Sequence, residues 1–543
     1  MGAHVSPKTR LSMSLNERIK HFLSAWFSKI NPPVFFGAAG IVLAFILFGG
    51  IFTNTAERVF NRVLDFITAH FGWYYVVITA AFLVFVVWLY FSKYSRIRLG
   101  GPDARPEFSN FAWFTMLFAA GMGMGLVFWG VAEPLTHYAE PPDADPQTPQ
   151  ALRDAMRYSF FHWGLHPWAV YIIFGLGIAY FHYRHGLPLA PRSMLFPLLG
   201  RRIFGPIGHL TDIICTVGTL LGVATSLGLG AMQINSGFHA LLDVEVSPAN
   251  QLLIIGTITL VATTSTITGV GRGIKYLSML NIYIMFGLLL FVAIVGPTGY
   301  QVKIFLTTLG EYLQNLPRMS LHMDISPDAS WQGEWTFFYW GWWISWCPFV
   351  GIFVARISRG RTIREFIQYV FVLPPLVTFL WISVFGGTGL FLEQYQDIDL
   401  TTVVTDNVAI SLHALLEHLP MTNLMQWISL VLIIIFFITS SDSGSLVDDM
   451  VTSGGHPNPP AVQRAFWGLS EGAAAAVLVV AGGLSALQSA SISGGLIQSI
   501  LVIFSAVSLT KALKVDSQHE GVPDLTDLHD GTPESPAAEE WLD

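Results

Sequence analysis

Charged residues are scarce in this sequence, and cysteine is almost absent. Only 12% of the 543 residues are charged, whereas 52% are hydrophobic. A water-soluble protein of this length needs more charged residues on its surface than this chain has. Most of the chain must therefore have lipid as its solvent. The two cysteines, Cys215 and Cys347, both lie inside apolar runs. This placement excludes a disulfide framework and a CxxC metal site, and it favours two small buried packing residues.

Several kinds of functional machinery are also missing. The sequence contains no GxxxxGK[ST] phosphate-binding loop and no polar segment large enough for an ATPase or sensor domain. The net charge of −8 does not favour a nucleic-acid partner. The apolar stretches show no nucleophile with a base and no metal-ligand set, so we do not expect an enzyme. A channel or receptor would need a continuous polar pore or a signalling domain, and neither is seen.

The chain is instead built from long apolar stretches. A helix of about 20 apolar residues crosses the hydrocarbon core of a bilayer. We predict twelve such spans, and therefore an all-α polytopic membrane protein. The predicted spans are 34–53, 71–92, 108–132, 157–183, 206–233, 251–270, 276–297, 334–355, 366–389, 424–441, 464–483 and 485–510. Because the first span begins well inside the chain and is long enough to cross the bilayer, we expect no cleavable signal peptide.

The basic residues indicate the orientation of these spans, because cytoplasmic loops collect Lys and Arg. If the N-terminus lies inside, most of the 28 Lys and Arg residues fall in inside segments. The exceptions are Arg58, Arg62, Arg153, Arg157, Lys303 and Arg318. We therefore predict that both termini face the cytoplasm. The arginines of the segment 356–364 are most simply a cytoplasmic anchor.

Three segments lie outside the predicted spans. Residues 1–30 form a polar cytoplasmic lead-in, and the acidic residues 513–543 predict a disordered cytoplasmic tail. Residues 298–333 are polar enough to lie outside the bilayer, and their apolar spacing favours a helix along the periplasmic membrane surface. An ordinary packed loop helix would show the same pattern.

Glycine is concentrated in the middle of the third span. Gly121, Gly123 and Gly125 alternate with Met122 and Met124. Each glycine weakens a helix by about 1 kcal/mol relative to alanine, so we predict local unwinding that exposes backbone carbonyls to a cation or substrate. The alternative is a GxxxG packing face made by Gly121 and Gly125.

Aromatic residues cluster within the fourth and eighth spans, away from the bilayer surface where membrane tryptophans usually lie. The eighth span carries a single helical face of aromatics at spacings of three and four residues. A box of aromatic rings can hold a quaternary ammonium group, which donates no hydrogen bond and is best bound by cation–π contacts. The aromatic residues are Trp163, Trp168 and Tyr171 in the fourth span, and Tyr339, Trp342, Trp343 and Trp346 in the eighth.

The tenth span ends in a run of hydroxyl residues from Thr439 to Ser445. Hydroxyl and carbonyl oxygens suit Na⁺, although such side chains also bond back to their own helix and mark its end. His162 and His166 flank the tryptophans of the fourth span. They are candidates for proton transfer, but hydrogen-bonded structural histidines are the more common case.

Together these motifs closely resemble the betaine/choline/carnitine transporter family over residues 30–512. The most specific of them is Trp342-Trp343-Ile-Ser-Trp346-Cys-Pro-Phe349, which continues to the arginines of 356–361. The resemblance implies a homotrimer in the bacterial inner membrane with a leucine-transporter-type fold and alternating access. Two peripheral helices (31–107) would precede two inverted five-helix repeats, 108–297 and 334–512, joined by the surface segment 298–333.

The resemblance also implies the site residues. Trp163, Trp168, Tyr171 and Trp343 would surround the ammonium group, with Trp346 guarding the cytoplasmic exit and Trp342 toward the periplasm. The glycine segment Met122, Gly123, Met124 and Gly125 would face the substrate carboxylate. The main Na⁺ site would use Ala119, Met122, Phe436, Thr439 and Ser440. A second Na⁺ site would draw on Thr219 and Phe349, but Val223 stands where a further hydroxyl is expected.

The glycine segment distinguishes substrates within the family. Proton-coupled choline carriers place an aspartate where this chain has Gly125, so its absence favours a zwitterion carried with sodium as the coupling ion. Sodium-independent carnitine exchangers use an arginine in the fifth span, which here has no Lys or Arg. A proton-coupled choline importer and a dimethylsulfoniopropionate transporter remain as alternatives. The short acidic tail does not favour osmosensing by a basic extension.

Overall fold

The computed structural model describes Phe27 and residues 29–517, except for 122, 269–270, 326–329 and 457–458. Nearly all of the predicted lead-in (1–30) and most of the predicted tail (513–543) therefore lie outside the described residues. Disorder from residue 513 onward is nevertheless wrong, because the last helix runs to Asp516. The Asp516 carboxylate is buried, and it accepts hydrogen bonds from Tyr180 and from Nε2 of His185. These bonds hold the start of the predicted tail against the bundle.

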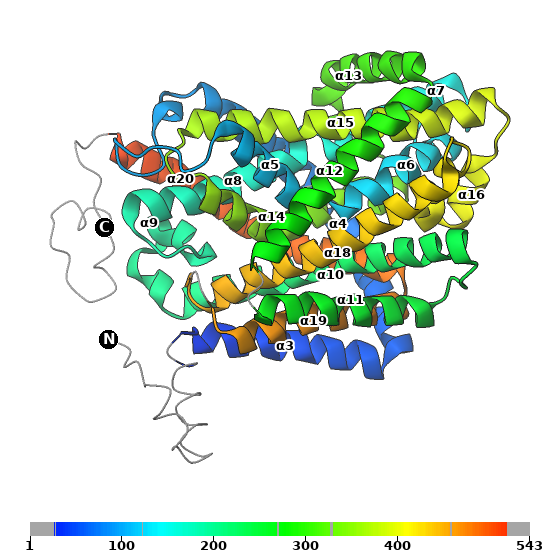
Figure 1. Ribbon diagram of the computed structural model, residues 1–543. Coiled ribbons are helices and arrows are strands. Elements are labelled where there is room, and N and C mark those ends of the chain that lie inside the picture. The colour runs from blue at the N-terminus through cyan, green and yellow to red at the C-terminus, as the bar shows by residue number, and fades with distance from the viewer. Residues whose placement is uncertain are drawn as a thin grey trace.

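The described chain is a bundle of long helices, most of which run across the molecule in Figure 1. The helices are α3 (Pro32–Ile51), α4 (Thr53–Phe91), α5 (Asn110–Gly121), α6 (Met124–Ala139), α7 (Pro149–Trp163), α8 (Leu165–His185), α9 (Phe196–Leu199), α10 (Pro206–Leu242), α11 (Pro248–Thr268), α12 (Gly271–Val295), α13 (Thr298–Ser320), α14 (Phe338–Ile357), α15 (Ile363–Tyr395), α16 (Leu400–Asp406), α17 (Ser411–Glu417), α18 (Thr422–Thr452), α19 (Ala461–Val480) and α20 (Leu484–Asp516). Every predicted span falls on one helix or on two consecutive helices. Within the described residues, nine helical segments are long and apolar enough to cross a membrane. The all-α polytopic prediction is confirmed.

Helix α4 is much longer than the predicted span 71–92. It begins at Thr53, directly after α3, and continues for 39 residues. The extra turns are helical because one of their faces packs on the start of α20. Ala56 and Ile67 on that stretch are buried, and Ser489 of α20 donates a 2.8 Å hydrogen bond to the carbonyl of Phe60.

Two of the predicted spans are interrupted. In the third, α5 ends at Gly121 and α6 begins at Met124 after a non-helical Gly123, which confirms the predicted unwinding. The fourth is split into α7 and α8 at Gly164, which we did not predict. A Cβ at Gly164 would lie 2.5 Å from both the carbonyl oxygen of Phe160 and the hydroxyl of Tyr312, so only glycine fits this crossing.

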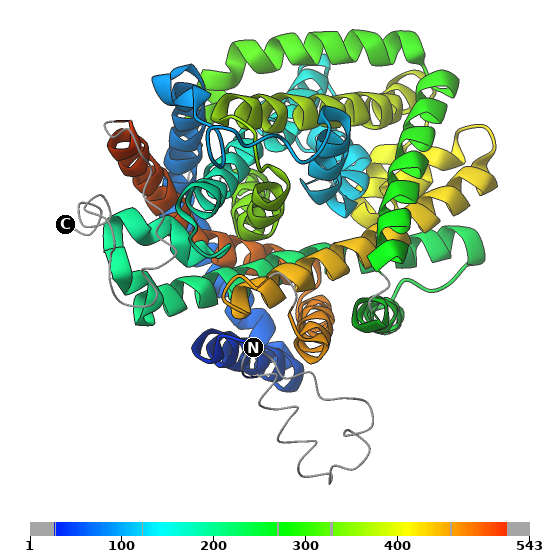
Figure 2. The same ribbon diagram turned by 60° about the vertical axis from the view of Figure 1, so that its left-hand side comes forward.

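Helix α14 forms the centre of the molecule, where Figure 2 shows it surrounded by the other helices. All residues from 335 to 352 are buried. It packs chiefly against α8 and α20, while α10 packs against α18. Helix α13, predicted as a surface helix, lies at one edge of the bundle in both views and contacts α7 and α15. The division into two five-helix repeats stays a prediction.

Candidate functional site

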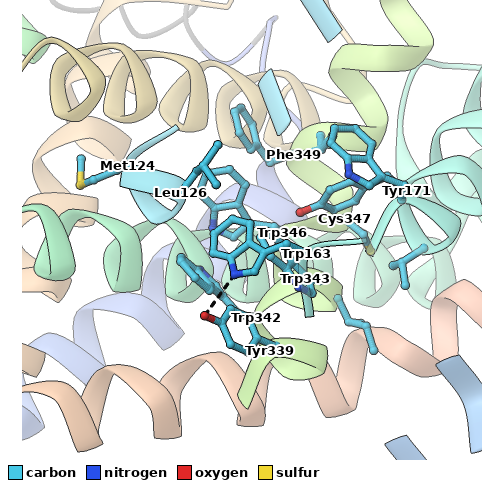
Figure 3. Close-up of a cluster of buried hydrophobic side chains, with 14 of the residues drawn as sticks. Met124, Leu126, Trp163, Tyr171, Tyr339, Trp342, Trp343, Trp346, Cys347 and Phe349 are labelled. Carbon is cyan, nitrogen blue, oxygen red and sulfur yellow. Dashed lines mark hydrogen bonds between the residues drawn. The ribbon is translucent and has the colours of Figure 1, made fainter. Parts of the chain in front are cut away.

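Three tryptophan rings from two helices pack together at the centre of the bundle. Trp163 is the last residue of α7, and Trp342 and Trp343 lie on α14. Trp342 and Trp343 stack with ring centroids 5.3 Å apart, and Trp163 meets Trp343 edge-on at 4.9 Å. Figure 3 shows these rings gathered with Tyr339 and Trp346. The structure thus brings Trp163 against Trp342 and Trp343, which lie 179 and 180 positions later in the sequence.

The other predicted box residues extend this cluster in two directions. Tyr171 lies 6.3 Å from Trp343, and Trp168 contacts Tyr171 at 5.5 Å. Trp346 meets Trp342 at 6.4 Å and Phe349 at 5.2 Å. Trp342 therefore contacts both Trp343 and Trp346, and its position toward the periplasm stays a prediction. We call Trp163, Trp168, Tyr171, Trp342, Trp343 and Trp346 the aromatic cluster.

The aromatic cluster is closed in this conformation. None of its six residues is more than 7% exposed. Ring pairs with centroids about 4.5–7 Å apart are in direct contact, and the pairs described above all fall in this range. A trimethylammonium group bound among these rings would therefore have to separate them.

Four polar atoms of the aromatic cluster are buried without a hydrogen-bond partner among the described residues. They are Nε1 of Trp168, Trp342 and Trp346, and the hydroxyl of Tyr171. The indoles of the remaining two members are satisfied, because Trp163 donates to Glu133 at 2.8 Å and Trp343 donates to the His162 carbonyl at 2.9 Å. Buried donors are almost always paired in proteins, so these four donors could all pair with an acceptor that enters the cluster.

The glycine segment lies against this cluster. A Cβ at Gly125 would come within 2.6 Å of Cη2 of Trp342 and 3.2 Å of Cη2 of Trp163. Met124 points elsewhere, since its sulfur fills the space beside Gly230 of α10, and Figure 3 shows it apart from the rings. Among the described residues of the glycine segment, Gly125 is therefore the one that lies directly against the aromatic cluster.

The predicted main Na⁺ site is described only in part. Met122 lies outside the described residues, and of Ala119 only its position in α5 is described. Beside them, a Cβ at Gly123 would lie 3.3 Å from the Phe436 ring and 3.8 Å from Oγ of Ser440. The break between α5 and α6 thus faces the hydroxyl run of α18.

The hydroxyl of Thr439 bonds back to its own helix. It donates to the carbonyls of Ile435 at 2.9 Å and Phe436 at 3.2 Å. A donating hydroxyl keeps its oxygen lone pairs for a cation, so this bond is compatible with both interpretations of the hydroxyl run. Thr219, predicted for the second Na⁺ site, is buried on α10 with its hydroxyl unpaired in the described structure.

Phe349, also predicted for the second Na⁺ site, lies one helical turn beyond Trp346. A Cβ at Gly222 would touch Cδ1 of Trp346 at 2.7 Å, so this part of α10 packs closely on α14. Val223, where a further hydroxyl was expected, points toward Gly444 of α18 instead. Of the two hydroxyls expected at the predicted second Na⁺ site, the described residues therefore supply that of Thr219 alone.

A buried carboxylate beside the aromatic cluster escaped the sequence analysis as a site residue. Oε2 of Glu133 accepts from Trp163 at 2.8 Å and from the Tyr339 hydroxyl at 2.5 Å. Oε1 lies 2.7 Å from Nδ1 of His162 and 3.2 Å from Nε2 of His137. An ionisable residue in an apolar helix is a signal in itself and could have revealed this network.

The same residues correct the expectation that the spans hold no metal-ligand set. Glu133, His137 and His162 place three possible ligand atoms within 4.8 Å of one another. These atoms already bond to each other, and Nε2 of His162 pairs with Thr336 at 2.9 Å. His166 stands apart from this network and stacks on Trp340 at 5.1 Å. In this network Glu133 holds both histidines, while Nδ1 of His137 has no hydrogen-bond partner among the described residues.

Comparison with known proteins places this architecture in one family. Residues 33–518 match the family model described as BCCT, betaine/carnitine/choline family transporter. The glycine betaine transporter OpuD of Bacillus subtilis is 44% identical over 483 residues, which cover 88% of this chain and 94% of that protein. Glycine betaine transporter 1 of Vibrio parahaemolyticus is 40% identical, covering 91% and 95% of the two chains.

Another relative is named for a different substrate, choline. The high-affinity choline transport protein of Escherichia coli is 38% identical over 492 residues, covering 90% of this chain and 73% of that protein. The family model spans nearly the whole described structure. The chain belongs to the betaine/carnitine/choline transporter family and is a multi-pass membrane transporter rather than an enzyme.

Proposed function

We propose that this protein imports glycine betaine, or a similar quaternary-ammonium or sulfonium zwitterion, by sodium symport and alternating access. It would work as a homotrimer in the bacterial cytoplasmic membrane, with both termini inside. The Bacillus and Vibrio relatives are both named as glycine betaine transporters, which supports a quaternary-ammonium zwitterion as the substrate class.

The observation that carries the proposal is the combination of ring faces and unpaired donors in one cluster. The faces of Trp163, Trp342 and Trp343 suit a cation that cannot donate hydrogen bonds. The unpaired indole N–H groups and the Tyr171 hydroxyl suit an anionic acceptor. A zwitterion supplies both charges in one small molecule, whereas choline supplies only the cation and a hydroxyl.

Sodium coupling is supported by the oxygen atoms around the helix break. Gly123 lies beside Phe436 and Ser440, where carbonyls freed by the break and hydroxyls of α18 can surround a cation. No lysine or arginine occurs along α10 to supply a fixed charge in place of Na⁺. Gly125 carries no carboxylate that could neutralise a substrate cation.

The test is uptake by proteoliposomes containing the full chain. Labelled glycine betaine and labelled choline are offered separately, first under an inward Na⁺ gradient and then under a proton gradient with K⁺ in place of Na⁺. We expect betaine uptake that requires Na⁺ and little choline uptake in either condition. Choline uptake driven by protons alone would contradict the proposal and favour the second candidate, a choline importer like the Escherichia coli relative.

A sulfonium substrate is tested in the same vesicles. Dimethylsulfoniopropionate carries a positive sulfur that satisfies the same ring faces. Unlabelled dimethylsulfoniopropionate is added as a competitor of betaine uptake under the Na⁺ gradient. Stronger competition by this compound than by unlabelled betaine would make it the preferred substrate.

A further inference from the structure

Helices α18 and α19 pack side by side along a seam of polar side chains, away from the aromatic cluster. At one end of the seam these side chains satisfy one another. Gln463 and Trp467 of α19 donate to the hydroxyl of Thr452 at 2.6 and 3.1 Å. The residues of the seam are Ser441, Ser445, Asp448 and Thr452 on α18, and Gln463, Trp467 and Glu471 on α19, spaced three or four residues apart on each helix.

The other end of the seam is not satisfied. Glu471 lies opposite Ser441, whose hydroxyl donates to Oε2 of Glu471 at 3.4 Å. Oε1 of Glu471 and both carboxylate oxygens of Asp448 have no hydrogen-bond partner among the described residues. Both residues are fully buried. Three acceptor atoms are therefore enclosed without donors.

Among the described side chains, no basic group pairs with either of these two carboxyl groups. Other buried acids in the described structure have such a partner, as Asp212 has Arg192 at 2.6 Å and Asp449 has Arg464 at 3.6 Å. Asp448 and Glu471 form no ion pair with any described Lys, Arg or His.

The two carboxyl groups face adjacent turns of α18. Oε1 of Glu471 lies 3.1 Å from the position that a Cβ would take at Gly444, and Asp448 follows Gly444 by four residues, about one helical turn. Two neighbouring buried carboxyl groups cannot both stay ionised without compensation, because like charges repel and desolvation disfavours each of them. At least one of the two must therefore be neutralised, either by a proton or by another cation.

A third helix brings further unpaired oxygens to the same place. Thr259 and Thr263 of α11 are buried, and neither hydroxyl has a partner in the part of the chain that is described. Two glycines of α19 allow this approach. A Cβ at Gly468 would lie 2.9 Å from the Thr263 hydroxyl and 3.9 Å from that of Ser445, and one at Gly472 would lie 2.3 Å from the Thr259 hydroxyl.

We propose that Glu471 and Asp448 bind one monovalent cation, a proton or Na⁺, between α11, α18 and α19. Carboxylate and hydroxyl oxygens are the ligands that such a cation takes, and all the unpaired atoms here are of these kinds. The site is distinct from the proposed Na⁺ site at Phe436, Thr439 and Ser440, which faces the break between α5 and α6. Both sites lie on α18, so occupancy of one can influence the packing of the helix that carries the other.

The experiment uses the purified full chain in detergent without substrate. Binding of ²²Na⁺ is measured at equilibrium, and infrared difference spectra between wild type and variant detect a protonated carboxyl group. The variants are Glu471→Gln and Asp448→Asn, and the matched control is Glu417→Gln, which removes an exposed carboxylate from α17. For a proton, we expect a carboxyl absorption in wild type that both variants lose. For Na⁺, we expect both variants to bind one ion fewer per chain.

Equal Na⁺ stoichiometry and an unchanged carboxyl absorption in both variants would overturn the proposal. The proposal would also be overturned if the control Glu417→Gln lost the bound Na⁺ ion or the carboxyl absorption, because that signal would then not depend on Glu471 and Asp448. If Glu471→Gln and Asp448→Asn do not fold, the test uses Thr263→Val, which leaves both carboxyl groups in place. It should weaken cation binding at least threefold, measured by ²²Na⁺ or by the pH midpoint of the carboxyl absorption, and unchanged binding would count against the site.

Discussion

The indole nitrogen of Trp163 donates a 2.8 Å hydrogen bond to Oε2 of Glu133. The same carboxylate oxygen accepts from Tyr339 on α14, so one buried acid on α6 joins α7 to α14. The ring of Trp163 meets Trp343 edge-on, and this hydrogen bond fixes its orientation. The carboxylate therefore positions the aromatic cluster without belonging to it.

Glu133→Gln should weaken substrate binding. The amide places N–H donors where Glu133 now offers only acceptors to His162, Trp163 and Tyr339, so at least one buried donor loses its partner. An unsatisfied buried group costs about 1–3 kcal/mol, which predicts a rise in KM for betaine uptake of about tenfold or more. Glu140→Gln, at the exposed end of the same helix, is the control and should transport like wild type. Equal KM values for the two variants would rule out the positioning role.

Replacement of Trp343 should separate the contribution of charge from that of shape. Cation–π contacts contribute up to about 2 kcal/mol when desolvated, so Trp343→Leu should weaken betaine binding by up to about 30-fold. Trp343→Phe keeps a ring and should lose less. Calorimetry with betaine is compared with calorimetry using 3,3-dimethylbutanoate, which replaces the charged nitrogen by carbon. If both ligands lose the same affinity in Trp343→Leu, the ring acts by packing and not through the cation.

Gly125→Ala should impair transport through a direct collision. The added methyl group would meet Trp342 at 2.6 Å, and overpacking of this kind costs about 1–3 kcal/mol. We expect kcat/KM to fall about tenfold. Gly256→Ala is the matched control, because a Cβ there meets no atom within 4 Å. Wild-type kinetics in Gly125→Ala would show that Trp342 moves away readily.

Tyr312→Phe should destabilise the break in the fourth span. The Tyr312 hydroxyl on α13 accepts from the backbone N–H of Leu165 at 3.0 Å, at the start of α8. Loss of this bond should cost about 1 kcal/mol and lower the Tm in a thermal-shift measurement. Tyr300→Phe on the same helix removes a hydroxyl that has no partner in the described structure, and should leave the Tm unchanged. Equal Tm values for the two variants would contradict the role of Tyr312.

Thr439→Ala tests the proposed main Na⁺ site. The loss of one oxygen ligand should raise the Na⁺ concentration for half-maximal betaine uptake about tenfold, equivalent to about 1.4 kcal/mol. Thr439→Ser keeps the hydroxyl and should stay close to wild type. The measurement is the initial uptake rate against Na⁺ concentration. An unchanged Na⁺ dependence in Thr439→Ala would favour the interpretation of Thr439 as a residue that only bonds back to its helix.

The sequence by itself determined that this chain is an all-helical membrane protein. Apolar stretches of the right length report directly on the solvent around a helix, so each predicted span matches helical structure. The glycines at 121, 123 and 125 determined the break between α5 and α6, because weak helix propensity is a property of the residues themselves. The sequence also singled out the tryptophans of the fourth and eighth spans, because membrane tryptophans usually lie at the bilayer surface and these lie within the spans.

Only the tertiary structure decided which side chains meet. Glu133 and Tyr339 are 206 positions apart, and no local pattern predicts their hydrogen bond. The break at Gly164 depends on Tyr312 of another helix, and the extension of α4 depends on the start of α20. The charge imbalance at Glu471 and Asp448 arises only when α11, α18 and α19 pack. Hydropathy and propensity act along the chain, whereas hydrogen bonding and charge compensation in a bundle are set by neighbours that the fold brings together.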